Sequence, residues 1–150
     1  MGTKVVQQEL VSAKLIGRWE QVGQKLAALA EEIPEGKFDY RPVDGIRTFA
    51  AVFRHVAFWN QYVADSARGR NGDDTANELP KDAFSTKPQI IRALKHSVAD
   101  AAGAWRESAS GLSPESAEML VTFIEHNSEH YGQLVVYARL NGITPPASRG

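Results

Sequence analysis

The sequence contains no cysteine, which excludes disulfide bridges, thiolate metal ligands and a cysteine nucleophile. It also lacks an excess of charge of either sign, because 17 basic residues face 18 acidic residues and the formal net charge is −1. This balance gives no electrostatic footprint for nucleic acid or for an anionic membrane. Any chemistry must therefore depend on other side chains.

Long apolar runs are missing as well. No run approaches the roughly 20 residues that a membrane span requires, and the first ten residues, MGTKVVQQEL, lack the apolar segment of a secretory signal. We therefore expect a cytoplasmic protein. A length of 150 residues with 43% hydrophobic content suits a single domain, residues 1–150, around one core.

Four segments show the alternating three- and four-residue spacing of apolar residues that indicates amphipathic helices. They cover about 5–32, about 48–67, a segment that begins after Thr86 and stops before Gly111, and 114–141. Thr48 and Ser113 are suitable N-cap residues for the second and fourth segments. No segment has a convincing strand pattern, so the predicted fold class is an all-α four-helix bundle.

The connections constrain the topology of this bundle. Only a few residues around Gly111 join the third and fourth helices, so these two should be antiparallel neighbours. The connection between the second and third helices is long, and a helix of 20 residues measures only about 30 Å. That connection can traverse the bundle, which allows the second and third helices to run parallel in an up-down-down-up arrangement.

Three histidines are the candidate chemical groups. His126 and His130 are four residues apart on the fourth helix, so both imidazoles project from the same face, which is the apolar face that should point into the bundle. On the second helix, His55 shares an inward-looking line with Trp59 and Tyr62. Imidazole is a common ligand for zinc, nickel or iron, and three protein ligands with one open position are typical of catalytic zinc sites. We therefore predict a metal site on His55, His126 and His130.

Other interpretations of these residues stay open. A histidine on an apolar face is usually a hydrogen-bonded core residue, so the three could be structural and bind no metal. The string from His126 to His130 also matches the H-x-x-E-H pattern, with Glu129 as general base, but residues 131–150 contain no acidic ligand. No glutamate has a histidine three residues later, which excludes the usual di-iron carboxylate bundle. His96 falls on the opposite face of its helix and should meet solvent.

The aromatic residues divide into two groups. Trp19 and Trp105 fit the apolar stripes of their helices and should belong to the core. Trp59 and Tyr62 could either pack in the core or line a cavity beside His55.

Two long segments resemble the DinB-like superfamily of bacterial metal-dependent proteins. They are FDYRPVDGIRTFAAVFRHVAFWN and HNSEHYGQLVVYARLNGITPPAS, and the likeness extends over nearly the whole chain. The resemblance places the metal triad of the family on His55, His126 and His130. It further implies an up-down-down-up bundle that often forms a homodimer and binds a divalent ion, most typically zinc or nickel, with iron and manganese as alternatives. Some relatives are S-transferases or isomerases that use low-molecular-weight thiols such as bacillithiol or mycothiol, and many have no established reaction.

Three functional hypotheses follow from these patterns. The first is an enzyme whose metal takes a small thiol in its open position, with a metal-dependent hydrolase as the nearest variant. The second is a metal-binding stress-response protein without turnover, and the third is an interaction module without metal. The expected partner is a small-molecule substrate, with no nucleic acid and no membrane. The sequence assigns no catalytic residue and does not name the metal or the reaction.

Overall fold

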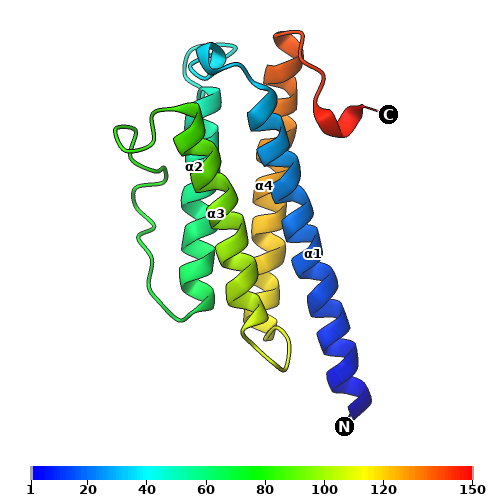
Figure 1. The fold of residues 1–150 in the computed structure, drawn as a ribbon. Coiled ribbons are helices and arrows are strands. Elements are labelled where there is room, and N and C mark those ends of the chain that lie inside the picture. Colours follow the sequence, from blue (N-terminus) through cyan, green and yellow to red (C-terminus); the bar gives the residue numbers. More distant parts are fainter. Residues whose placement is uncertain (1, 150) are drawn as a thin grey trace.

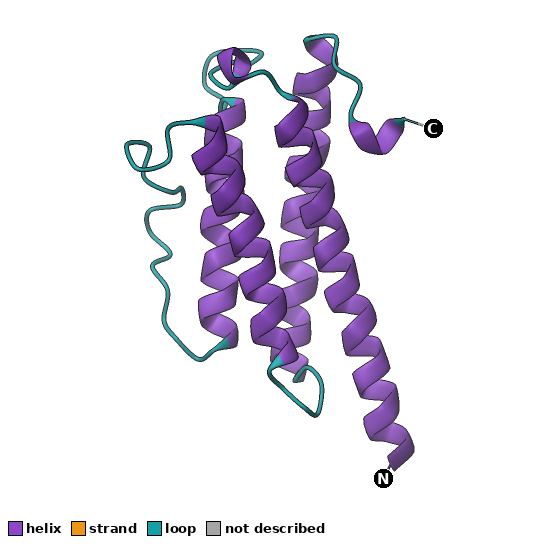
Figure 2. Ribbon diagram, in the orientation of Figure 1, coloured by secondary structure: helices purple, strands orange, loops and turns teal. Residues whose placement is uncertain are grey.

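The structure is a computed structural model, and it describes residues 2–149. Its main elements are α1 (Gly2–Glu32), α2 (Phe49–Ala67), α3 (Lys87–Arg106) and α4 (Pro114–Leu140), with short 3-10 turns η1 (Glu35–Lys37) and η2 (Pro146–Ser148). Within this part of the chain there are only helices and loops, and no strand (Figure 2). The predicted all-α fold class is therefore confirmed.

The four helices form a bundle in which two neighbours in sequence run parallel. As Figure 1 shows, α1 rises, α2 and α3 both descend, and α4 rises again. The residues between α2 and α3, 68–86, return along the full length of the bundle, and we call this segment the long link. The up-down-down-up topology that the length of this connection allowed is thus the observed one.

Local capping explains where the helices begin. The Thr48 hydroxyl accepts a hydrogen bond from the Ala51 N–H at 3.1 Å. Thr86 forms a capping box with Gln89, in which each side chain bonds to the other residue's backbone N–H. The Ser113 side chain caps α4 in the same way as Thr48 caps α2. These contacts satisfy N–H groups that the first turn of a helix leaves without partners, and so fix the helix starts.

The core consists of two apolar clusters along the bundle. One is built around the aromatic residues Phe49 and Phe53 of α2, which are fully buried. The other contains Trp19 and Trp105, whose rings meet edge to face with centroids 5.1 Å apart. The Trp19 indole N–H donates to the Val98 carbonyl at 3.0 Å, which satisfies its polar group inside the core. The predicted structural role of these two tryptophans matches the observed packing.

The spacing of apolar residues predicts that the buried stripe of α3 consists of Ile91, Leu94, Val98, Ala101 and Trp105. The observed buried face differs from this stripe in detail. Ile90 and Ser97 are buried, whereas Ile91 and Val98 are only half-buried. A prediction from apolar spacing does not include Ser97, because serine is polar. It can be buried because its hydroxyl forms hydrogen bonds with Asn60 and Leu94 inside the bundle.

The outer surface carries apolar side chains at the start of α1. Val5, Val6, Leu10 and Val11 are each at least 44% exposed, on the first turns of α1, and the beginning of this helix extends beyond the other helices (Figure 1). Among residues 2–149, no helix combines the length and the apolar character needed to cross a membrane.

Candidate metal centre

The structure brings the three predicted histidines together. His55 comes from α2, and His126 and His130 come from successive turns of α4. One ring nitrogen from each residue lies within 4.8 Å of the other two. The ring centroids are 5.0 Å apart for His55 and His126, 4.7 Å for His55 and His130, and 4.6 Å for the α4 pair. We call these residues the histidine triad.

The triad lies at the edge of the bundle and not in its centre. His55 is only 6% exposed, but His126 and His130 are half-buried, which is less than their apolar stripe predicted. The reason is that the buried face of α4 is centred on Leu120 and Leu134, which places the two histidines beside this face. The triad is therefore held by the core on the α2 side and is open to solvent on the α4 side.

The Nδ1 atom of His55 is the ring nitrogen that carries the proton. It lies 2.7 Å from the backbone carbonyl oxygen of Asn77, a residue of the long link. A carbonyl oxygen can only accept a hydrogen bond, so this Nδ1 carries the proton and donates. In the neutral ring the other nitrogen, Nε2, is then an unprotonated acceptor.

A buried chain of hydrogen bonds, which we call a relay, determines which ring nitrogen of His126 carries the proton. The Ser97 hydroxyl donates to the Leu94 carbonyl at 2.8 Å and accepts from the Asn60 amide nitrogen at 3.3 Å. The Asn60 amide oxygen in turn accepts from the Asn127 amide nitrogen at 2.9 Å. The Asn127 oxygen thus remains as the acceptor for His126 Nδ1, 3.2 Å away. A backbone carbonyl on α3 therefore orients every amide in the relay, and Nε2 of His126 is left unprotonated.

A second relay fixes the role of His130. The Tyr137 hydroxyl donates to the Arg47 carbonyl at 2.8 Å and accepts from the Gln133 amide nitrogen at 2.8 Å. The amide oxygen of Gln133 is then the acceptor for His130 Nδ1, at 2.9 Å. All three imidazoles consequently donate from Nδ1 and present Nε2 as a free acceptor.

These tautomers fit a bound cation. Nε2 of His55 lies 3.0 Å from Nε2 of His126, so two acceptors face each other without a hydrogen between them. In a tetrahedral zinc site with Zn–N bonds of about 2.0 Å, two ligand nitrogens lie about 3.3 Å apart. The outer hydrogen bonds are also those that orient imidazole ligands in known metal sites. The residues present therefore suit a divalent metal ion.

His55 and His126 of the triad resist protonation near neutral pH, because their pKa values are lowered. Burial, with a contribution from the nearby charge of Arg47, lowers the pKa of His55 to about 4, despite the opposing effect of the bond to Asn77. Burial also lowers the pKa of His126, and the neighbouring His130 adds to this effect. His55 and His126 are therefore uncharged at neutral pH, which is the form of imidazole that binds metals.

Aromatic side chains form one border of the triad. Phe123 lies 5.6 Å from His126 between ring centroids, and Trp59 stacks on Phe123 at 5.9 Å. Tyr62 packs against Trp59 with centroids 5.1 Å apart. Trp59, Tyr62 and Phe123 are all half-buried, so they form an aromatic wall beside the triad and do not belong to the interior of the core.

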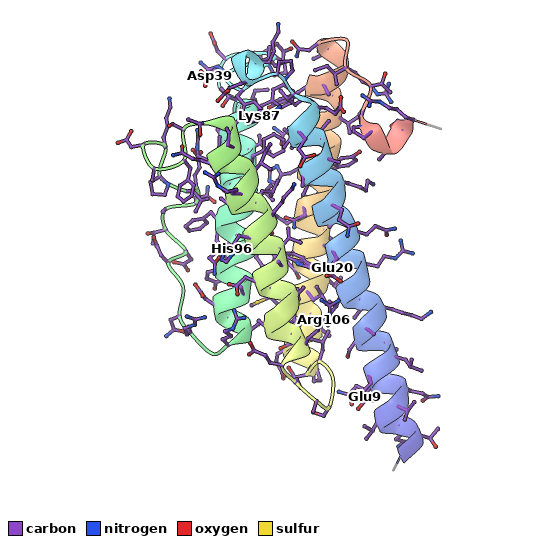
Figure 3. The ribbon with its side chains drawn as sticks, in the orientation of Figure 1. Glu9, Glu20, Asp39, Lys87, His96 and Arg106 are labelled. Atoms are coloured by element: carbon purple, nitrogen blue, oxygen red, sulfur yellow. The ribbon has the colours of Figure 1, made fainter. Side chains whose placement is uncertain are left out.

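The other candidate groups lie outside the cluster. His96 is exposed on α3, as predicted (Figure 3). Glu125 and Glu129 are exposed on α4, and no carboxylate of residues 2–149 joins the group that could hold an ion. The structure thus gives no support to Glu129 as a general base.

The sequence did not reveal the residues that orient the triad. Asn77 lies in a loop without periodicity, and it contributes its backbone carbonyl, a group that apolar periodicity does not report. Asn60 and Asn127 are fully buried on helix faces that otherwise carry apolar residues. Two asparagines on the facing apolar stripes of α2 and α4 were the available signal for a buried polar pair.

A protein-family model matches most of the chain. The model described as the DinB superfamily matches residues 18–134, which is most of the chain and includes His55, His126 and His130. A comparison with curated proteins finds no match. The chain belongs to the DinB superfamily.

Proposed function

We propose that the histidine triad holds one divalent metal ion, zinc or nickel, and that this centre acts on a small molecule. The observation that supports this proposal is the convergence of the three histidines, with one ring nitrogen of each within 4.8 Å of the other two and every Nδ1 atom already bonded. Three protein ligands leave one coordination position for water or for a substrate, which is the pattern of catalytic centres.

We further propose that the substrate is a low-molecular-weight thiol, which loses its proton and forms a sulfur–carbon bond to an electrophilic acceptor as that carbon releases its leaving group. A bound ion would supply a Lewis acid that lowers the pKa of a thiol at its open position. Because the chain contains no cysteine, the sulfur nucleophile has to come from a second molecule. The half-exposed edges of His126 and His130 admit such a molecule, and the aromatic wall offers an apolar surface for the acceptor.

A conjugation assay tests this function. Zinc-loaded or nickel-loaded protein is incubated with bacillithiol, mycothiol or glutathione and with a chromogenic electrophile, and the thioether is quantified. We expect conjugate above the uncatalysed rate, a loss of this activity in His130→Ala, and its retention in His96→Ala, because His96 is exposed and outside the triad. If protein with one ion per chain yields no conjugate with any of the thiols, the transferase proposal is wrong. The non-catalytic metal-binding alternative would then replace it.

We also propose that two copies of the chain associate. The four exposed apolar residues Val5, Val6, Leu10 and Val11 all lie on the first three turns of α1, and exposed apolar surface of this kind is typical of interaction sites. Light scattering should give the mass of a dimer, and the double substitution Leu10→Lys with Val11→Lys should give that of a monomer. A monomeric parent protein at assay concentrations would contradict this proposal.

A further inference from the structure

The long link is attached to α2 next to the triad. The Arg54 guanidinium is buried, pairs with Glu78 at 2.9 Å and donates to the Phe84 carbonyl at 3.2 Å. The backbone N–H of Leu79 donates to the carbonyl of Arg54 at 3.4 Å. The link is therefore fixed against α2 at the residue that precedes His55.

Asn77 connects the link to two residues of the site. Its backbone carbonyl accepts from His55 Nδ1, and its side-chain oxygen accepts from the Trp59 indole N–H, both at 2.7 Å. His55 and Trp59 are one helical turn apart on α2. One loop residue thus holds both a triad histidine and the first residue of the aromatic wall.

The backbone of Asn77 explains this double contact. Its φ angle is +64°, and it is the single residue other than glycine with a positive φ among residues 2–149. This left-handed conformation is unfavourable for most residues, whereas asparagine tolerates it well. Residues in such conformations persist where the surrounding structure requires them, and they cluster at functional sites.

The three histidines differ in how they are oriented. His126 and His130 bond to amides on their own helix, α4. His55 alone bonds directly to a loop residue, so its ring is held only while the link keeps the Asn77 carbonyl in place. A ring released from this carbonyl can take the other tautomer, in which Nε2 carries the proton and cannot bind a metal.

We infer that Asn77 is a positioning residue of the metal centre: its left-handed backbone aims its carbonyl at His55 and so keeps His55 Nε2 free for the ion. This inference rests on the proposed metal site. It assigns to the long link the task of setting the metal affinity, because outer-shell partners of ligating histidines typically change that affinity about 10- to 100-fold.

The test compares substitutions that keep or oppose the left-handed backbone. Asn77→Val disfavours positive φ because valine is β-branched, whereas Asn77→Gly permits it and removes only the bond to Trp59. Ala76→Val is the matched control, since it puts the same side chain on the exposed neighbouring residue, whose φ is not positive. The zinc dissociation constant of each variant is measured by competition with a chromophoric chelator.

We expect zinc affinity to fall about 10- to 100-fold in Asn77→Val. Asn77→Gly should lose less than Asn77→Val, and Ala76→Val should match the parent. Parent-like affinity in Asn77→Val, or an equal loss in Ala76→Val, would overturn the inference.

A second measurement needs no variant and no metal. The tautomer of His55 in the metal-free parent is read from long-range nitrogen–proton NMR correlations of the imidazole. The inference requires the proton on Nδ1, and a proton on Nε2 would overturn it even if Asn77→Val failed to fold. The two proposals also separate here: if the parent binds no zinc, the proposed function fails, while the NMR spectrum still tests the contact between Asn77 and His55.

Discussion

Replacement of Asn127 by alanine should destabilise the bundle through its buried polar relay. Asn127 and Asn60 are both fully buried, and the truncation leaves the Asn60 amide oxygen without its donor. A buried unsatisfied group costs about 1–3 kcal/mol. His126 also loses an acceptor, but it is half-exposed and water can replace that bond, so we add about 1 kcal/mol. The expected loss in the free energy of unfolding is therefore about 2–4 kcal/mol.

Urea unfolding of the metal-free protein, followed by circular dichroism, measures this loss. For a chain of this size the melting temperature should fall by about 5–15 °C. Asn71→Ala is the control, because Asn71 is exposed in the long link, and it should change stability by less than about 0.5 kcal/mol. In a double-mutant cycle, Asn60→Ala combined with Asn127→Ala should show a coupling energy of about 0.5–3 kcal/mol. A loss of less than about 0.5 kcal/mol, or strict additivity of the two changes, would refute the reasoning.

Three further predictions concern packing, pH and capping. A Cβ atom on Gly23 would lie 2.5 Å from a Val98 methyl, so Gly23→Val should lower the free energy of unfolding by about 1–3 kcal/mol, as measured by urea unfolding. Adding Val98→Ala should recover most of this loss. Gly17→Val is the control, because a side chain at Gly17 meets open space and Val98→Ala should not rescue it. In the metal-free protein, burial lowers the pKa of His55 from 6.5 to about 4, so the unfolded state binds more protons between these values. Stability should therefore decline as the pH falls from about 6.5 to about 4, and less steeply in His55→Gln; an equal slope in the variant would contradict this. Thr86→Ala removes the capping box of α3 and should lower the free energy of unfolding by about 1 kcal/mol, with an unchanged urea midpoint as the contrary result.

The fold was predictable because its determinants are local. Thr48, Thr86 and Ser113 mark the helix starts by side-chain hydrogen bonds to residues three positions later, which a sequence displays directly. The length of the long link allowed the parallel pair α2 and α3 without requiring it, and the structure contains this pair. The register of α3 was less accurate, since Ser97 is buried for a polar reason that apolar periodicity does not detect.

The triad was predictable for similar reasons, but its supporting contacts were not. A spacing of four residues places His126 and His130 on one face of any helix. In contrast, the groups that fix all three tautomers are the backbone carbonyls of Asn77, Leu94 and Arg47. Every residue has a backbone carbonyl, so no residue type in the sequence marks these positions.

The depth of the triad was also predicted imperfectly. Apolar neighbours in sequence placed His126 inside the bundle, whereas it is half-buried beside the face of α4 that contains Leu120 and Leu134. The width of a buried stripe depends on how closely the neighbouring helices approach, which is a property of the folded bundle and not of one helix.

Zinc stoichiometry tests the central claim most directly. Metal-free protein is dialysed against a slight excess of zinc, and the bound ion is quantified by elemental analysis for the parent, His130→Ala and His96→Ala. We predict one ion per chain in the parent and in His96→Ala, and a large loss in His130→Ala, because His130 belongs to the triad and His96 does not. A parent protein that retains no zinc, or a His130→Ala variant that binds it as tightly as the parent, would contradict the account.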